Sequence, residues 1–361
     1  MKKKRIKRAP FCGICLALSL LLLLFSAGCR RGSDQPLSPG LSLIAGEPIY
    51  EDDVAVRSDN FVVTPGMMAY FFYTYGANMM VQMEQEKAFD DSKSLHDQMF
   101  TETQSWYDVM MNETLAKVSE LLIYCEAGAA EGVKLDATVQ QAIADEMAAY
   151  RLEAAAQHGV ELDTYLQRLY GPLMRTEDLQ LVLELESFAN RFSLMLQQRL
   201  EQGITGEQAV EYAERNGLSD ATPSRNISFL FIPHENGEVA QGKVVQALSA
   251  LKQAPTAECM QTLSALGSYG EQGNMTPANS GIAPLTDWLF ASGRRVGDYG
   301  SVEVGGATYV LLYTGNGISY GEVAARMALF DSAYAEWYNG WVARIHFGYN
   351  YDCLDGYDKK Q

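Results

Sequence analysis

Apolar residues recur at alternating steps of four and three along two parts of the chain. Side chains at this spacing lie on one face of a helix, so each part is expected to be a helix packed along one side. The first stripe follows Ser105 and consists of Met111, Leu115, Val118, Leu122 and Cys125. The second follows Ser319 and consists of Val323, Met327, Phe330, Tyr334, Trp337 and Trp341. So wide an apolar face must be covered, and the helices before Asn216 are its available partner.

Glycines punctuate the helical run between Ser105 and about Asn216. The pattern Gly132-Val133-Lys134-Leu135-Asp136 recurs at residues 159–163, and a looser version begins at Gly203. In each, glycine can take the left-handed conformation that ends a helix, and the Asp or Thr that follows can cap the next helix. Thr205 with Gln208 also fits a capping box. The sequence therefore predicts a series of antiparallel helices.

A hairpin is predicted ahead of these helices. Val54-Ala55-Val56 and Phe61-Val62-Val63 flank the turn cluster Ser58-Asp59-Asn60. Thr64-Pro65 then fits an N-cap followed by the first residue of a helix. That helix is rich in methionine and aromatic residues, which can adapt to many apolar partners but are also typical of a core. The residues in question are Met67, Met68, Phe71 and Phe72.

Strand patterns return in the second half of the chain. Ile227–Ile232 and Tyr309–Tyr313 are dense apolar runs, and the apolar stretch Leu285–Phe290 comes shortly before the second. They define a small α+β module that extends from Ser224 to Tyr313. Since the chain before and after this module is predicted to be helical, the fold class is α+β, with the module inserted into a helical frame.

Composition narrows the range of partners. A chain of 361 residues exceeds one core of usual size, so two domains are expected. The hydrophobic fraction of 47% and aromatic fraction of 11% suffice for burial. The formal net charge is -17, although six of the first eight residues are basic. Such an acidic surface repels phosphate backbones, which makes nucleic acid an unfavourable partner.

The N-terminus has the pattern of an export signal. A basic run precedes the apolar stretch Leu16–Phe25, and Ser26-Ala27-Gly28-Cys29 follows. This ending resembles the lipobox of bacterial lipoproteins, apart from Ser26 where leucine is usual, and implies that Cys29 is lipidated. Several acyl chains would anchor the protein at the membrane on its extracytoplasmic side. The alternative is ordinary cleavage after Gly28. The Ser-, Gly- and Pro-rich stretch that follows predicts a flexible tether.

Few residues are available for covalent or metal chemistry. Of the three cysteines beyond Cys29, Cys125 falls on a helical stripe, while Cys259 and Cys353 could pair in an oxidising compartment. The four histidines lie far apart, and none has a second ligand at metal-binding spacing; they are His96, His158, His234 and His346. No metal site and no cofactor are therefore predicted. A solute-binding protein is disfavoured, since its strands and helices would alternate through both lobes.

The layout resembles the extracytoplasmic foldases of the PrsA and SurA type, which carry an inserted parvulin-type prolyl isomerase domain. The resemblance rests on Val54–Met68, Tyr170–Leu179, Val323–Trp341 and, within the module, Leu285–Asp298. It implies a short helix within Leu285–Asp298 and two further helices, around Val239–Leu251 and Glu258–Leu266. It implies five parts: residues 1–29 as signal peptide with lipobox, 30–46 as tether, 47–223 as helical chaperone domain, 224–317 as parvulin-like domain, and 318–361 as the closing helix that packs back on the helical domain.

Departures from the family pattern shape the functional prediction. Active parvulins carry a histidine in the first and last strands, whereas this chain has Phe229, or Asn226 in a shifted register, and Tyr309. We therefore expect a membrane-anchored holdase-type chaperone for unfolded exported polypeptides, with an inactive parvulin-like domain. An active prolyl isomerase and an assembly or scaffold lipoprotein are the alternatives. Candidate contacts are Phe229, Trp288, Phe290 and Tyr309 in the module, and Met67, Met68, Phe71 and Phe72 in the helical part.

Overall fold

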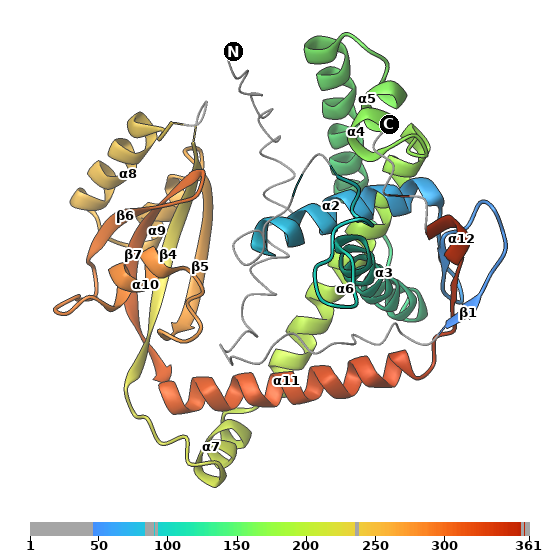
Figure 1. Cartoon of the computed structure of the whole chain (residues 1–361). Coiled ribbons are helices and arrows are strands. Elements are labelled where there is room, and N and C mark those ends of the chain that lie inside the picture. The colour runs from blue at the N-terminus through green and yellow to red at the C-terminus, as the bar shows by residue number, and fades with distance from the viewer. Residues whose placement is uncertain (1–45, 84–89, 91–92, 235–237, 355–356, 358–361) are drawn as a thin grey trace. The chain divides into compact units, whose positions relative to one another are not determined.

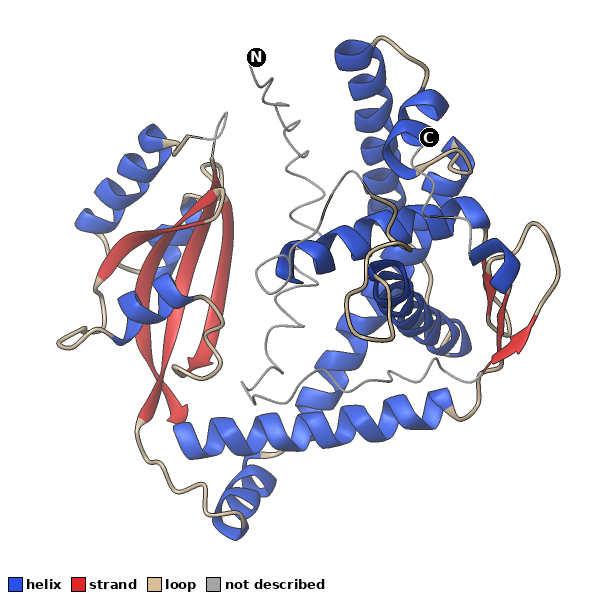
Figure 2. Cartoon of the chain, in the orientation of Figure 1, coloured by secondary structure: helices blue, strands red, loops and turns tan. Residues whose placement is uncertain are grey.

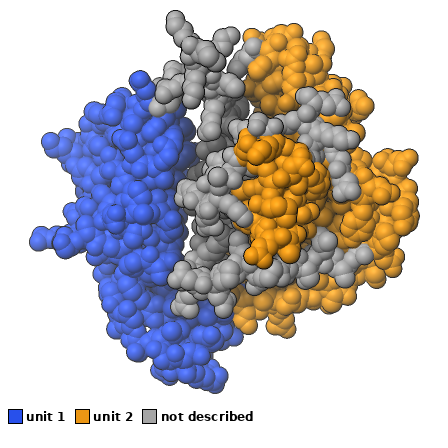
Figure 3. All heavy atoms as spheres, in the orientation of Figure 1, with its two compact units in different colours: residues 1–34, 204–330 blue, residues 35–203, 331–361 orange. Residues whose placement is uncertain are grey.

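Figures 1 and 2 show the protein as a computed structural model, which describes residues 46–83, 90, 93–234, 238–354 and 357. Cys29 and nearly all of the predicted tether lie outside the described residues. The chain divides into two compact units (Figure 3). We call the unit that contains residues 204–330 the sheet unit, and the one that contains residues 35–203 and 331–361 the helical unit. The combination of helices with two sheets is α+β, as predicted.

The helical unit is built around α3, which packs against α2 and α6. The unit also contains α4, α5 and α12, together with the second part of α11. The bounds of all these helices are α2 Pro65–Met83, α3 Trp106–Ala130, α4 Ala137–His158, α5 Leu162–Tyr170, α6 Thr176–Gly203, α11 Tyr320–Val342 and α12 Tyr351–Leu354. Among the described residues, no helix is both long enough and apolar enough to cross a membrane.

A small sheet in the helical unit joins the two ends of the described chain. Its strands are β1 Gly46–Pro48, β8 Phe347–Tyr349, β2 Val56–Arg57 and β3 Val62–Val63, in the order β1-β8-β2-β3. The predicted hairpin is confirmed, since β2 and β3 are antiparallel with Val56 opposite Val63. β8 lies between β1 and β2, parallel to the first and antiparallel to the second.

Most of the predicted helix ends are confirmed by their hydrogen bonds. Ser105 and Asp108 form a capping box at the start of α3, and Thr205 and Gln208 form one at the start of α7, Gly206–Arg215. Gly159 ends α4 with a left-handed φ of 62°. Asp136 caps α4 by accepting hydrogen bonds from the amides of Thr138 and Val139, each at 3.0 Å.

Two of the predicted glycine devices differ. Asp163 does not cap α5, because the helix already begins at Leu162 and places Asp163 in its first turn. Its carboxylate instead accepts hydrogen bonds from the Thr176 amide at 2.8 Å and the Thr176 hydroxyl at 2.6 Å. It therefore joins α5 to the start of α6. Gly203 is the last residue of α6 and does not have a positive φ, so no left-handed residue ends that helix.

The end of α11 packs onto the helical unit through aromatic residues. The rings of Trp337 and Tyr124 on α3 are stacked, with centroids 5.7 Å apart. Phe192 on α6 lies 5.9 Å from Trp337, and the hydroxyls of Tyr124 and Tyr334 are 2.7 Å apart. The predicted covering of this apolar stripe by earlier helices is therefore confirmed for its last members.

The sheet unit holds a four-stranded antiparallel sheet of order β5-β4-β7-β6. The predicted strands Ile227–Ile232 and Tyr309–Tyr313 are direct neighbours, with Phe229 opposite Leu311 and Phe231 opposite Tyr309. The elements after α7 are β4 Pro223–Pro233, α8 Gln241–Gln253, α9 Ala257–Thr262, β5 Ser268–Met275, α10 Ala283–Phe290, β6 Tyr299–Val304 and β7 Ala307–Ser319.

Side chains alternate along each central strand, so each face of this sheet has its own set of apolar side chains. Helices cover both faces. On one face Leu230, Val310 and Leu312 form a core cluster with residues of α8 and α9. On the other, Ile227 and Leu311 form a cluster with Leu285 and Leu289 of the eight-residue helix α10. Figure 2 shows α10 crossing one side of the sheet, with α8 and α9 on the other side.

Candidate functional site

The eight residues predicted to contact polypeptide fall into two groups. Met67, Met68, Phe71 and Phe72 on α2 belong to the core of the helical unit, and none is more than 2% exposed. Their side chains pack against α3 and neighbouring helices, which is what their helical spacing and apolar character favour. In this structure the four present no surface to a partner.

Predicted contacts of the sheet unit do come together on the side of the sheet that carries α10. We call the set of residues gathered there the aromatic face. The Tyr309 ring lies between two phenylalanine rings of β4, with its centroid 5.9 Å from that of Phe229 and 5.2 Å from that of Phe231. Tyr309 is 6% exposed, and the other members are partly exposed. The aromatic face consists of Phe229, Phe231, Trp288, Val302, Val304 and Tyr309.

Phe231 was not singled out as a contact by the sequence, although its position carries the signal. It lies two residues after Phe229 on one strand, so both side chains project to the same face. Phe290, which was singled out, packs against the same core cluster, but its ring contacts the Arg225 guanidinium at 5.2 Å and Tyr320 at 6.5 Å, so it is not counted in the aromatic face. Phe290 thus helps to fix the end of α10.

Two glycines leave room for large rings over the sheet. Gly270 of β5 is opposite Phe229, and a Cβ placed there would overlap the Phe229 ring. A Cβ at Gly300 of β6 would meet the Trp288 indole in the same way. The absence of side chains at both positions is therefore what lets Phe229 and Trp288 cover neighbouring strands.

Two arginines hold the C-terminal end of α10. Arg225 donates a hydrogen bond from Nη1 to the Leu289 carbonyl, and Arg294 donates from Nε to the Trp288 carbonyl at 3.0 Å. The Arg294 guanidinium also lies 4.0 Å from the centre of the Trp288 ring. These cations satisfy carbonyls that a helix end leaves free and complement its negative end. Trp288 is therefore fixed between an arginine and a glycine.

The aromatic face offers little acid–base chemistry. Its one titratable side chain is Tyr309, and burial raises the pKa of that hydroxyl above its ordinary value. His234 follows β4, where its amide donates to the Gly306 carbonyl at 2.8 Å and its ring meets the Thr308 hydroxyl at 3.4 Å. Thr308 and Tyr309 are consecutive in β7, so their side chains project to opposite faces. His234 therefore lies away from the aromatic face.

Asn226 does not join the aromatic face either. Its Oδ1 accepts a hydrogen bond from the Asn274 amide at 2.8 Å, and its Nδ2 donates to the Asn316 carbonyl at 3.3 Å. Asn274 has a φ of 55°, and its Oδ1 accepts from the Ile318 amide at 3.1 Å. These side-chain amides join β4, β5 and β7 where the ladder is irregular, which is a structural role.

Potential metal ligands and thiols are dispersed within the described part of the chain, where no group of three or more His, Cys, Asp or Glu could hold a metal ion. Cys125, Cys259 and Cys353 are free thiols. Cys259 belongs to the sheet unit and Cys353 to the helical unit. Burial raises the pKa of the Cys125 thiol well above its usual range, so this cysteine is unreactive.

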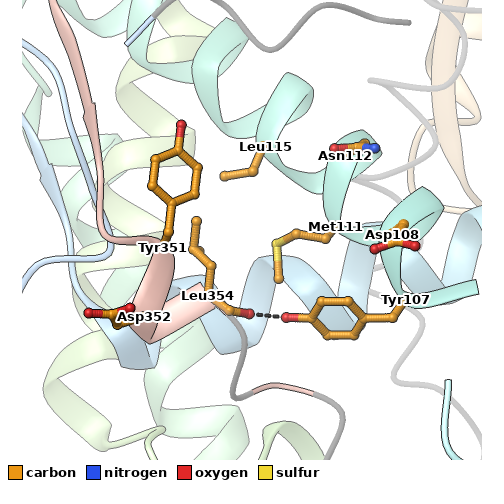
Figure 4. A pocket seen from close by; sticks show the side chains of 8 residues that line it. All are labelled: Tyr107, Asp108, Met111, Asn112, Leu115, Tyr351, Asp352 and Leu354. Carbon is orange, nitrogen blue, oxygen red and sulfur yellow. Dashed lines mark hydrogen bonds between the residues drawn. The ribbon is translucent and has the colours of Figure 1, made fainter. Parts of the chain in front are cut away.

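A small cleft opens between α3 and α12 in the helical unit, with a volume of about 230 Å³ (Figure 4). The Tyr107 hydroxyl donates a hydrogen bond to the Leu354 carbonyl at its lower edge. Drug-sized ligands occupy pockets of about 300–1,000 Å³, so this cleft can accept a single side chain. Its lining residues are Tyr107, Asp108, Met111, Asn112, Leu115, Tyr351, Asp352 and Leu354.

No protein-family model matches the chain. No curated protein matches it either. Among solved structures it is similar to PrsA from Bacillus subtilis, with 14% identity, a TM-score of 0.33, and coverage of 75% of this chain and 95% of that one. For the foldase PrsA from Streptococcus pneumoniae these values are 11%, 0.28, 88% and 95%. For a structure of the SurA-like chaperones PEB4 and Cj1289 of Campylobacter jejuni they are 12%, 0.23, 82% and 98%. These solved structures are of the type that the sequence resembles.

Proposed function

We propose that this protein is an extracytoplasmic, membrane-anchored folding factor that holds unfolded exported polypeptides. Its parvulin-like domain serves for binding and is catalytically inactive. The observation that carries the proposal is the aromatic face, a partly exposed apolar surface with three aromatic rings side by side and no histidine or carboxylate among its members.

Binding is what such a surface can do. Phe229 and Phe231 are partly exposed beside Tyr309, and covering such rings removes apolar area from water. The surface is small, and association has to offset the loss of freedom of an unfolded chain. Weak contacts that discriminate little between sequences are the expected result. A factor that holds many different polypeptides and then releases them needs contacts of that kind.

The surroundings of Tyr309 support the proposed inactivity. Rotation about a prolyl peptide bond has to overcome a barrier of about 18–20 kcal/mol. A catalyst lowers it with groups that stabilise the twisted amide more than the planar one. Here the Tyr309 ring lies between two phenylalanine rings. Neither Phe229, nor Asn226 in the shifted register, nor Tyr309 supplies the histidine that the family carries.

Location and anchoring rest on the sequence. The lipobox-like Ser26-Ala27-Gly28-Cys29 supports lipidation at Cys29 and export. Clients would then be exported polypeptides that have not yet folded. The domain limits proposed from the sequence, 47–223, 224–317 and 318–361, stay a prediction.

Two measurements on the mature protein test this function. Dilution of denatured, reduced lysozyme into buffer causes aggregation, and we expect the protein to suppress the resulting light scattering. In parallel, we expect no acceleration of a refolding reaction that is limited by prolyl isomerisation. Acceleration would show an active isomerase and overturn the claim of inactivity. Absence of any suppression would overturn the holdase.

A matched pair of variants locates the binding surface. Phe231→Ala removes a ring from the aromatic face and should weaken suppression. Tyr299→Ala removes a ring from β6, where Tyr299 packs with the core cluster on the opposite side of the sheet. This control should retain suppression once both variants are shown to be folded. Equal losses in the two variants would place the binding surface elsewhere.

A further inference from the structure

Strand β5 is an open edge of the sheet in the sheet unit. It pairs with β4 on one side, and its residues Glu271, Gln272, Gly273 and Asn274 are exposed. In an antiparallel ladder, every second residue of an edge strand points its N–H and C=O away from its partner. Between Ser268 and Gly273, no other described segment of the chain provides a hydrogen bond to those outward groups. They form a row that an extended chain can pair with.

The two edges of this sheet differ in their protection. Helices α8 and α10 both contact β6, which is the opposite edge, whereas β5 has comparable contacts with β4 and β7 alone among the described elements. Natural edge strands are commonly blocked by proline, lysine or a bulge. The stretch Ser268–Gly273 contains neither proline nor lysine. Its ladder with β4 is regular from Ser268 to Gln272, and the irregularity follows between Gln272 and Met275.

The side chains around this edge indicate what would fit there. Because Gly270 lacks a side chain, the tip of the Phe229 ring occupies the space over β5 that a side chain there would fill. A strand paired with β5 would therefore bring one of its apolar side chains against Phe229. On the opposite face of β5, Glu271 is exposed and accepts a hydrogen bond from the Tyr269 hydroxyl. A basic side chain of the incoming strand would lie near this carboxylate.

We propose that β5 binds an extended segment of an unfolded polypeptide as a fifth strand, with apolar residues toward Phe229 and basic residues toward Glu271. The inference rests on the proposed function and specifies its mode of binding. Main-chain hydrogen bonds supply affinity that does not depend on sequence, as strand addition does generally. The charge of Glu271 supplies a preference for segments with lysine or arginine, in keeping with the acidity of the chain as a whole.

Backbone-modified peptides test strand addition directly. The probe is a fluorescent eight-residue peptide of alternating valine and lysine, as long as β5, titrated with the mature protein. Two modified versions carry N-methyl groups on alternate residues, one version on the valines and the other on the lysines. In a strand paired with β5, the N–H groups of either the valines or the lysines point toward β5, but not those of both. One modified peptide should therefore bind at least about tenfold more weakly, and the other nearly normally. Equal binding of all three peptides would overturn the proposal.

Hydrogen exchange and two charge-reversal variants test whether the peptide binds at β5. Bound peptide should slow exchange of amides in Ser268–Gly273 and leave those of β6 unchanged. Glu271→Lys should weaken binding of the basic peptide severalfold, while Glu303→Lys, the same change on the exposed part of β6, should have little effect. Protection confined to β6, or a larger effect of Glu303→Lys, would contradict the assignment.

Two further outcomes separate this inference from others. If β5 were instead the contact between two copies of this chain, sedimentation would show a dimer that the peptide dissociates, and that result would overturn a client site. Suppression of lysozyme aggregation is measured independently of the peptide. If the protein suppresses aggregation but binds all three peptides equally, the proposed function stands and strand addition is refuted. If the protein does not suppress aggregation, the proposed function itself is refuted.

Discussion

The Tyr75 hydroxyl on α2 donates a hydrogen bond to Glu186 on α6, with 3.1 Å between the two oxygens. Burial between these helices raises the pKa of Glu186 to about 7, the hydrogen bond from Tyr75 opposes that change, and the charge of Glu146 adds to it. The carboxyl group is therefore protonated in the folded protein at mildly acidic pH and titrates near neutrality.

Stability should depend on pH through this group. The folded protein binds the Glu186 proton more tightly than the unfolded chain, whose glutamate pKa is about 4.3. The stabilising contribution is complete below that value and is lost as pH rises through about 7. We expect the free energy of unfolding by urea to fall between pH 5 and pH 8 by on the order of 1–3 kcal/mol. Glu186→Gln should flatten that change, and an unaltered pH profile in this variant would contradict the assignment.

The closing helix should owe much of its attachment to Trp337. Its ring is stacked on Tyr124 and tilted against Phe192, so truncation leaves a gap between three helices. Trp337→Ala should lower the free energy of unfolding of the helical unit by about 2–4 kcal/mol, given that the ring is only partly buried. Asn339→Ala, at an exposed position of the same helix, is the control and should be nearly neutral. Equal effects in urea titrations would show that the stack contributes little.

The arginines at the end of α10 should be needed to keep that helix on the sheet. Arg225→Ala and Arg294→Ala each remove a donor to a helix carbonyl and a cation placed over an aromatic ring. Each should cost about 1–2 kcal/mol and speed amide exchange in residues 283–290. Arg295→Ala changes a neighbouring exposed arginine and should leave exchange there unchanged. Faster exchange in all three variants would indicate a general effect of charge.

The sequence predicted those features that depend on local patterns. Dense apolar runs identified the paired strands of the sheet unit, and caps such as Ser105 and Thr205 mark where helices begin because they bond to their own first turn. Features that depend on contacts between distant parts of the chain were not predicted. β8 has three residues and no periodicity, and its place between β1 and β2 joins segments almost 300 residues apart. The bonds of Asp163 to Thr176 and of Arg225 to Leu289 likewise depend on where distant segments meet.

The same distinction explains the predicted contact residues. Met67, Met68, Phe71 and Phe72 have the composition of an adaptable surface, and composition does not reveal whether other helices cover it. Tyr309 and Phe229 lie together because two adjacent strands fix which side chains share a face. How far a ring extends across the sheet depends on the residue opposite it. The pairing register between β4 and β5 determines that residue, and it cannot be deduced from the sequence of either strand alone.

Gly270 should therefore control the position of Phe229. In Gly270→Ala the new methyl group overlaps the ring, and because Gly270 lacks a positive φ, the backbone itself accepts alanine. The overlap should cost about 1–3 kcal/mol of stability and displace Phe229 from the edge of β5. Gly306→Ala, where a Cβ meets nothing within 4 Å, is the control and should change stability by less than about 1 kcal/mol.

A double-mutant cycle shows whether the cost at Gly270 acts through the Phe229 ring. Once Phe229→Ala has removed the ring, the additional change Gly270→Ala should cost clearly less than it does in the unmodified protein. Urea unfolding of the four proteins provides the coupling free energy. The same set, assayed for aggregation of reduced lysozyme, should show that Gly270→Ala weakens holding about as much as Phe229→Ala. Additive stabilities would mean that alanine at position 270 acts on the strand itself, and the ring would then owe its place across β5 to some other contact.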